Sequence, residues 1–494
     1  MDHSDQPPTE SRLKRHIGLW ALAATGICSM IGASIHVVPF MIQKNVPGIG
    51  PYVLPAFLLA AVPALFAAVA YAALASAMPR AGGSYLFASR GLSPFAGFIA
   101  SFSQWFGLSI AIGVISYIIV NFMSDLAGAV GLNELSMILI NGPVKPIVAL
   151  VILWLFVGLN IRGSRSYGNT LLPLMWMMFI LGGIVIVAGL FFDTGDFQQG
   201  LMNKEGRTFT TEAVADFNLP VFLSAAAVLF ASFIGFDSIA QAGGEAVDAK
   251  QNIPKAIAMA VIGVTLFYLL FTASVYHMVP WQFIATESQT RDISAPAMLG
   301  YVLPSGWTIA ILAGATISLI NDLPGMILSV SRLLYAWSAD GIFPRPLARV
   351  HRTHGTPDAA ILASGAMASI GILGSHFAGS FFLGIDIMVT AMLVNFMLMC
   401  ITLLTLPHVN PEIGKSVTLI GPRAASITGI CGTLILAGFL TIHIYKDLSH
   451  PADAWYFQST WIWLVVMAIG SVIYLVTTMN NPTVKEQFKH LPEH

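Results

Sequence analysis

The chain contains 494 residues, of which 56% are hydrophobic and only 10% are charged, and its formal net charge is −1. Because soluble domains carry about 25% charged residues, this composition excludes an ordinary soluble protein and indicates one that lies in a lipid bilayer. The near-zero net charge argues against a nucleic-acid partner. Cys28, Cys400 and Cys431 fall inside apolar stretches without metal-ligand spacing, so we expect no metal site, no cofactor and no disulfide framework.

Twelve apolar stretches approach the length of roughly 20 residues that a helix needs to cross a bilayer. They are 17–43, 52–78, 95–123, 146–161, 170–191, 219–245, 255–279, 306–337, 359–377, 381–406, 424–445 and 456–479. Lys and Arg concentrate in the connections on the side of the N-terminus, which predicts that both termini are cytoplasmic. The sequence therefore predicts an all-α, multi-pass integral membrane protein with 12 transmembrane helices, and we expect it in the plasma (inner) membrane.

The first stretch carries the segment Gly26-Ile-Cys-Ser-Met-Ile-Gly-Ala-Ser34 at its centre. A glycine inside a helix costs up to about 1 kcal/mol relative to alanine, so two glycines six residues apart predict a weak point. Close packing against a neighbouring helix is the alternative explanation of such small residues.

The third stretch contains serines on the same helical face as Trp105, namely Ser101 and Ser109. A polar face on an otherwise apolar helix indicates a surface that lines a pathway rather than lipid. We therefore expect Trp105 to act as a gating residue.

The sixth stretch, 219–245, is interrupted by Ser232 and Gly235, and Asp237 follows directly. A break frees backbone groups that lipid cannot satisfy, so they must face protein or a water-filled cavity. A carboxylate at membrane depth is costly and is a functional-site hypothesis by default. Beyond the break, the spacing of Asp237, Gln241 and Glu245 predicts one helical face. A kinked helix with a satisfied aspartate is the alternative.

The first and sixth stretches share one pattern at their centres. Ser29-Met-Ile-Gly32 matches Ser232-Phe-Ile-Gly235, five stretches later. Matching interruptions in corresponding positions of two halves are typical of inverted-repeat transporters and mark their binding site.

The eighth stretch carries small or polar residues on one face, namely Ser318, Asp322, Gly325, Ser329 and Arg332. This continuous face predicts that the helix lines the pathway. Three roles are open for Asp322: a structural acceptor of amides from an unwound neighbour, a proton-coupling site, or a counter-ion for a cationic side chain.

The sequence contains no nucleotide-binding loop, dinucleotide fingerprint, metalloprotease helix or nucleophile elbow. We therefore expect no enzymatic activity, and transport would have to run on gradients rather than on ATP.

Four further motifs, in order, give the chain a family resemblance. They are Met30-Ile-Gly-Ala-Ser-Ile35, Pro79-Arg-Ala-Gly-Gly-Ser-Tyr85, Phe233-Ile-Gly-Phe-Asp237 with Asn252-Ile-Pro254, and Ser331-Arg-Leu-Leu-Tyr335 with Asp340-Gly-Ile-Phe-Pro344. With these motifs the chain resembles the amino-acid permeases of the amino acid–polyamine–organocation (APC) superfamily.

The resemblance implies a leucine-transporter-like 5+5 inverted repeat with two peripheral helices. The transport core would be 17–406, with 17–191 as repeat one and 219–406 as repeat two. The two extra transmembrane helices would occupy 424–479. We expect cytoplasmic tails at 1–16, which is disordered, and at 480–494.

The resemblance also places the substrate where the first and sixth helices unwind. Gly32, Ala33 and Ser34 would bind its carboxylate, and Ile27, Phe230 and Ser232 its amine or the adjoining wall. The complete expected set comprises Ile27, Cys28, Ser29, Gly32, Ala33, Ser34, Phe230, Ala231, Ser232, Phe233 and Gly235 for the substrate, and Asp237, Asp322 and Trp105 for coupling or gating.

The chain departs from the family pattern at several positions. Ala231 stands where many relatives carry a bulky aromatic gate, and His36 stands where Phe is usual. The fifth stretch has Met175 or Trp176 in place of the lysine that some proton-driven relatives use. The resemblance thus implies the substrate class but leaves the coupling ion open.

The predicted function is secondary active transport of amino acids or closely related amines by alternating access, coupled to H⁺ or working by exchange. A polyamine or organic-cation permease is the alternative within the class. A nutrient receptor that does not transport, an accessory-dependent subunit and a membrane enzyme are the alternatives outside it. Besides the substrate and a possible coupling proton, membrane lipid is the expected partner, and the sequence does not predict the oligomeric state.

Overall fold

The computed structural model of the chain describes residues 15–208, 216–378, 381–449 and 454–480, except for the side chains of 33–34, 164–170 and 480. Eleven helical segments of the described residues are long and apolar enough to cross a membrane. They are α4 (Val53–Ala77, preceded by the 3-10 turn η1, Gly50–Tyr52), α6 (Pro94–Ala129), α8 (Val144–Arg162), α9 (Ser164–Ala188), the segment Leu219–Gln241, α13 (Ala249–Met278), α16 (Ser305–Ala339), α17 (Asp358–Ala378), α18 (Phe382–Val409), α20 (Pro422–Ser449) and α21 (Ser459–Asn480).

The first predicted crossing is a broken helix, which is why it is not among these eleven. It consists of α1 (Leu19–Met30), α2 (Ala33–His36) and α3 (Val38–Asn45). The sixth crossing is broken too, into α11 (Leu219–Leu229), the 3-10 turn η2 (Phe230–Phe233) and α12 (Asp237–Gln241). Both breaks fall at the predicted glycines, so the all-α fold and the two interruptions are confirmed.

The prediction that Asp237, Gln241 and Glu245 share one helical face beyond the second break is wrong for Glu245. The helix α12 ends at Gln241, and Glu245 lies in the turn that leads to α13. Two glycines, Gly243 and Gly244, follow α12, and Gly243 packs directly against the backbone of Arg80, where a side chain would clash. The chain therefore turns here instead of continuing as a helix.

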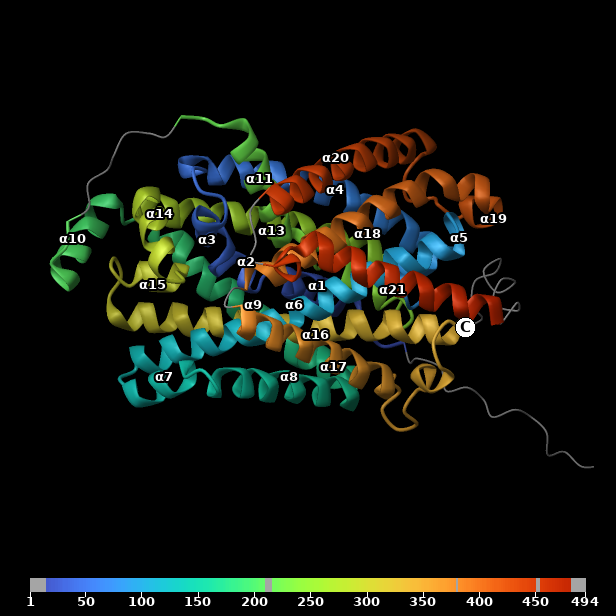
Figure 1. The fold of residues 1–494 in the computed structure, drawn as a ribbon, viewed down its shortest axis with the longest axis horizontal. Coiled ribbons are helices and arrows are strands. Elements are labelled where there is room, and N and C mark those ends of the chain that lie inside the picture. The colour runs from blue at the N-terminus through green and yellow to red at the C-terminus, as the bar shows by residue number, and fades with distance from the viewer. Residues whose placement is uncertain (1–14, 209–215, 379–380, 450–453, 481–494) are drawn as a thin grey trace, which may run out of the picture.

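Shorter helices connect the crossings and gather at the two ends of the bundle. They are α5 (Gly83–Gly91), α7 (Asn133–Ile140), α10 (Thr194–Glu205), α14 (Trp281–Thr290), α15 (Ala295–Leu299), η3 (Arg345–Ala348), α19 (Pro411–Gly414) and η4 (Trp455–Phe457). Figure 1 shows α7, α10, α14 and α15 at one end, here named the loop face. At the opposite end, the terminal face, are α5, α19 and the last turn of α21.

Ion pairs hold α10 against α14 at the loop face. Arg207 binds Glu287 at 2.9 Å, and Glu287 also binds Arg291 at 2.8 Å. The Tyr301 hydroxyl donates to Glu205, and this hydrogen bond lowers the pKa of the Glu205 carboxyl. The connection between the fifth and sixth crossings thus contains a packed helix over Thr194–Glu205.

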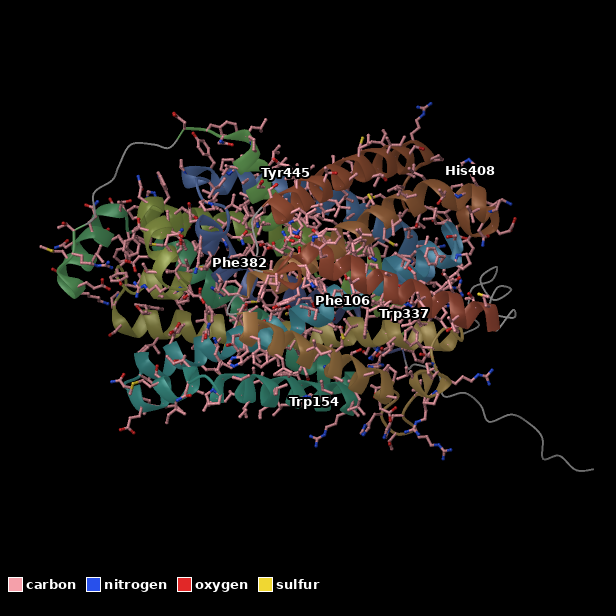
Figure 2. All side chains as sticks on the ribbon, in the orientation of Figure 1. Phe106, Trp154, Trp337, Phe382, His408 and Tyr445 are labelled. Atoms are coloured by element: carbon pink, nitrogen blue, oxygen red, sulfur yellow. The ribbon has the colours of Figure 1, made fainter. Side chains whose placement is uncertain are left out.

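The helix α6 runs through the middle of the bundle, where it packs against α16, α17 and α18. Figure 2 shows Phe106 and Trp337 inside the bundle, and Trp154 and Tyr445 at its surface. The helices α6 and α17 approach at backbone distance, because a Cβ on Gly371 would lie 2.5 Å from the carbonyl oxygen of Ile110. Small residues permit this close approach of membrane helices.

We predict that Gly371→Ala lowers the melting temperature of the purified protein, because the added methyl group separates α6 from α17. Gly374→Ala is the matched control, since nothing lies within 4 Å of a Cβ at Gly374, one turn away on the same helix. The control should be neutral or slightly stabilising, because alanine favours helix by about 1 kcal/mol over glycine. Equal melting temperatures for the two variants would contradict this packing.

Candidate functional site

The two broken helices cross and touch at their breaks. Gly235 has φ = 137°, a conformation that favours glycine, and a Cβ there would clash with the carbonyl group of Ser29. Gly26 likewise packs against the side chain of Ile239 in α12. The structure therefore brings the two predicted Ser-x-Ile-Gly segments together at one place.

Side chains of neighbouring helices satisfy the carbonyl groups that the first break frees. Tyr268 of α13 donates its hydroxyl to the carbonyl oxygen of Met30. Ser318 of α16 donates to the carbonyl oxygen of Ile31 at 2.6 Å. Asn321 of α16 also donates to the thiol of Cys28, which lies one turn before Ile31, at 3.0 Å. The break is thus held by two other crossings, as the low polarity of the bilayer requires.

Asp322 lies directly against the first break. A Cβ on Gly32 would clash with the Asp322 carboxylate, so the glycine makes room for this side chain. The carboxylate is buried, and its Oδ1 atom has no hydrogen-bond partner among the described residues. The titratable group that faces the Asp322 carboxylate from α1 is the Cys28 thiol, which accepts a hydrogen bond from Asn321, the residue before Asp322.

Asp237 fixes the second break from within. Its Oδ1 accepts a hydrogen bond from the backbone amide of Gly235 at 3.1 Å, and Oδ2 accepts one from the Gln104 side chain in α6. Gln241 of α12 reaches the same amide group, with 3.2 Å between its Nε2 and the Gln104 Oε1. The predicted aspartate is therefore a satisfied one that anchors α12 to α6.

Gln104 is the centre of a buried network that the sequence analysis missed. Ser84 and Asn395 both donate to its Oε1, and Tyr71 donates to the Asn395 side chain. These residues come from α4, α5, α6 and α18. A glutamine and an asparagine inside otherwise apolar stretches were the available signal, because polar groups in membrane helices mostly face the bundle interior.

The apolar members of the predicted site are divided between the break and the core. Phe230 packs edge-on against Phe396 and Phe439, so its ring points toward α18 and α20. Phe233 packs against Phe57 and Tyr268. Ile27 and Ala231 are the apolar side chains that keep a trace of exposure, at 7% and 2%.

Several buried polar atoms around the breaks have no partner among the described residues. They are Ser29 Oγ, Ser232 Oγ, Asn321 Oδ1 and Asp322 Oδ1. Unsatisfied buried polar groups are uncommon in folded proteins, and a concentration of them requires an explanation such as a bound ligand. Their gathering at the crossing indicates a place built to receive a polar molecule.

Two sets of predicted site residues lie elsewhere or cannot be placed. Trp105 packs against Phe102 and Trp337 and donates to Ser364 at 3.4 Å, which puts it in an aromatic cluster instead of at the breaks. The backbone of Ala33 and Ser34 begins α2, but their side chains lie outside the described ones. Among the described residues, no cluster of three or more His, Cys, Asp or Glu could hold a metal ion.

A buried ion pair lies between the breaks and the terminal face. Arg332 of α16 binds Glu245 through two nitrogens, at 2.6 and 2.7 Å, and both side chains are almost fully buried. The backbone amides of His16 and Ile17 donate to the Glu245 carbonyl group at 2.9 and 3.0 Å. The ion pair and these two hydrogen bonds are together named the latch. The latch ties the start of α1 to α16 and to the turn after α12. Arg90 and Asp340 form a second buried pair at 2.9 Å.

Comparison with known proteins agrees with this architecture. The profile of the family described as "Amino acid permease" matches residues 17–482. The branched-chain amino acid permease BcaP of Bacillus subtilis (strain 168) is 27% identical over 74% of this chain and 76% of its own length. Cationic amino acid transporter 4 is 26% identical in Mus musculus, over 88% of this chain, and 25% in Homo sapiens, over 73%.

The chain spans 66% and 55% of the length of the mouse and human cationic transporters. The relatives named are permeases and transporters rather than enzymes. With a profile match over nearly all of its length and the expected multi-pass helical fold, the chain belongs to the amino acid permease family.

Proposed function

We propose that this permease is a secondary active transporter that carries amino acids across the plasma membrane by alternating access, with both termini in the cytoplasm. The observation that carries the proposal is the crossing of two broken helices, surrounded by the unpartnered atoms of Ser29, Ser232, Asn321 and Asp322. Free backbone groups at broken helices suit the charged ends of an amino acid. The names of the relatives support the same substrate class.

In this proposal the backbone at Gly32, Ala33 and Ser34 binds the substrate carboxylate. Ile27, Ser232 and the backbone at Phe230 line the amine end, with Cys28, Ser29, Ala231 and Phe233 around it. The hydroxyl groups of Ser318 and Tyr268 already donate hydrogen bonds to carbonyl groups of the first break. They would hold the unwound backbone in place before the substrate arrives, which reduces the ordering cost of binding.

We further propose that Asp322 carries the coupling proton. An ionised carboxylate that is buried without a cationic partner is strongly disfavoured, and the carboxylate adjoins the position proposed for the negative end of the substrate. Two anions at this place would repel each other, so the substrate carboxylate binds when Asp322 is protonated. Substrate and proton would then cross together.

A second candidate function follows from the same unpaired carboxylate. Asp322 could be the counter-ion of a cationic substrate, since a positive group next to it would satisfy its free oxygen. The name of the cationic amino acid transporters is consistent with this candidate. The two proposals differ in what happens when the charge of Asp322 is removed.

Alternating access also requires the latch to open. Losing one partner of a buried ion pair costs about 3–5 kcal/mol, because the other charge stays buried and unpaired. We propose that the closed terminal face depends on Glu245 and Arg332, and that their separation opens the path from the breaks to that face.

The first prediction concerns the substrate carboxylate. A methyl ester or a decarboxylated amine should compete at least about tenfold less well than the parent amino acid, because hydrogen bonds to a charged group contribute about 1.5–3 kcal/mol. The measurement is inhibition of labelled amino-acid uptake into proteoliposomes, over a panel of amino acids. Equal competition by an amine without a carboxylate would instead support a polyamine or organic-cation permease.

The second prediction concerns Asp322→Asn. If Asp322 carries the proton, the variant should retain exchange of substrate and lose accumulation driven by a pH gradient, since asparagine mimics the protonated form at every pH. Wild-type uptake should rise as the pH on the donor side falls, because the substrate requires the protonated carboxyl group. Asp386→Asn, another carboxylate within a crossing, is the control and should keep the pH response.

The same variant separates the second candidate. Loss of cationic substrates with retention of neutral ones would identify Asp322 as a counter-ion. An Asp322→Asn protein with wild-type pH dependence and wild-type selectivity would defeat both roles.

The third prediction uses Cys28 as a reporter of opening. In a Cys400→Ala, Cys431→Ala background, Glu245→Gln should increase the rate at which a polar thiol reagent modifies Cys28 from the terminal face. Glu412→Gln is the control, because its ion pair with Lys415 lies exposed on α19. An unchanged rate of Cys28 modification in Glu245→Gln would show that the latch does not close the path.

A further inference from the structure

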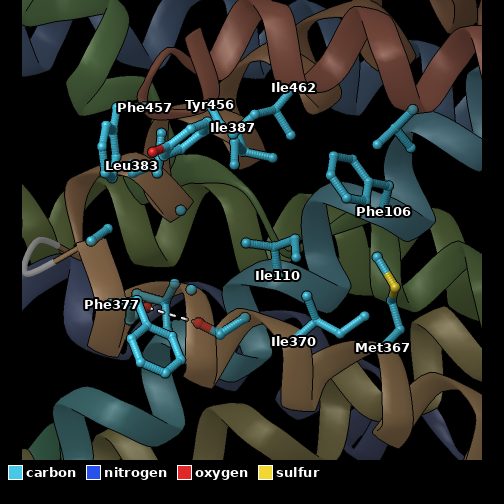
Figure 3. A pocket seen from close by; sticks show the side chains of 17 residues that line it. Phe106, Ile110, Met367, Ile370, Phe377, Leu383, Ile387, Tyr456, Phe457 and Ile462 are labelled. Atoms are coloured by element: carbon cyan, nitrogen blue, oxygen red, sulfur yellow. Dashed lines mark hydrogen bonds between the residues drawn. The ribbon is translucent and has the colours of Figure 1, made fainter. Parts of the chain in front are cut away.

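An apolar groove lies outside the crossing of the broken helices. It has a volume of about 570 Å³ and is enclosed by α6, α17, α18 and the segment that includes η4 and the start of α21. Phe106 and Ile110 form its floor on α6, and Ile462 faces them from α21, as Figure 3 shows. None of the predicted substrate or coupling residues lines it.

The lining of the groove offers no free polar group in its depth. Ser375 donates its hydroxyl to the carbonyl oxygen of Gly371 at 2.9 Å, so this polar atom is already satisfied. The remaining wall is aliphatic or aromatic, apart from the Tyr456 hydroxyl at one end. The groove therefore suits hydrocarbon and gives a polar solute nothing to bind.

The groove opens toward the bilayer. The helices α6, α17, α18 and α21 are all membrane crossings by length and hydropathy. On α17, Ile370 and Phe377 are 55% and 80% exposed, so the described helices leave this wall of the groove uncovered. Within the membrane, the medium at this opening is lipid hydrocarbon.

The ends of this chain are poorly placed to fill the groove. The groove lies where α17 ends and α21 begins, and α21 runs 22 residues, or about 33 Å, from there to Asn480. At the other terminus, His16 is bound beside Glu245 and the latch. Both terminal segments therefore start near the terminal face, a membrane thickness away.

A helix of a second copy is also a poor occupant. With a diameter of about 10–12 Å including side chains, a helix would fill this volume within about one turn. An acyl chain is narrower and more flexible than a helix, and the apolar lining of the groove suits its hydrocarbon. At the end of the groove, the rings of Tyr456 and Phe457 resemble the aromatic residues that sit at the level of lipid headgroups.

We propose that this groove binds the acyl chains of a membrane phospholipid, whose headgroup lies beside Tyr456 and Phe457. The lipid completes the packing of α6 against α17 and α18 and is a bound component of the folded permease. The proposal is independent of the substrate and of proton coupling.

The test uses the full chain in nanodiscs of phosphatidylcholine that contain phosphatidylglycerol with a photoreactive acyl chain. After illumination, peptides of α17 and α21 are analysed by mass spectrometry for lipid adducts. The wild-type protein should carry adducts on residues that line the groove, such as Met367 and Val466. Gly374→Phe should lose them, because nothing lies within 4 Å of a Cβ at Gly374 and the new ring can occupy the groove without a clash at its base.

Gly183→Phe is the matched control, since Gly183 lies in the crossing α9 and its Cβ also meets nothing within 4 Å. It should keep the adducts in the groove. If Gly374→Phe does not fold, Val466→Trp fills the groove from the opposite wall and should have the same effect.

Two results would overturn the proposal. The first is equal labelling of the groove in Gly374→Phe, Val466→Trp and wild type. The second is a change in oligomeric state on filling the groove, measured by native mass spectrometry without loss of lipid, which would make this face an interface between copies.

Discussion

The bilayer cannot satisfy backbone hydrogen bonds, and this constraint determines what surrounds the two breaks. At both breaks, side chains of another crossing or of a residue close to the break bind some of the freed groups. Tyr268 and Ser318 reach the first break from α13 and α16, while Asp237 serves the second. A broken helix in a membrane therefore requires its neighbours to be in place, which explains why polar residues are distributed over so many helices.

The two breaks are held in different ways. In the second, Asp237 binds the amide of Gly235 two residues away, and Gln104 attaches the same carboxylate to α6. In the first, the carbonyl groups depend on α13 and α16. A displacement of α16 relative to α1 must therefore break the bond from Ser318 to Ile31, whereas the turn at Gly235 can persist. The conformational sensitivity of the site resides in the first break.

The crossings and both breaks could be predicted from the sequence, because apolar length and the Ser-x-Ile-Gly pattern are local properties of the chain. The end of α12 was not predicted. The spacing of Asp237, Gln241 and Glu245 assumes that the helix continues to Glu245, but it ends at Gln241, two residues before Gly243 packs against the backbone of Arg80. The helix that contains Trp105 was predicted correctly. The position of its side chain was not, because its contacts with Trp337 and Ser364 join segments that are far apart in the sequence. The Gln104 network and the latch are likewise long-range pairings, which no spacing along the chain encodes.

The ion pairs near the two ends of the bundle differ in how deeply they are buried. At the terminal face, Glu245–Arg332 and Arg90–Asp340 are buried pairs, and separating one leaves charges without water or a partner. At the loop face, Arg207 and Arg291 are about half exposed, while Glu287, which pairs with both, is only 11% exposed. The arginines of the loop face can therefore regain water when these pairs separate, whereas those of the terminal face cannot without a wider rearrangement. In the proposed mechanism, the substrate supplies binding energy by satisfying the free polar atoms at the first break as the latch separates.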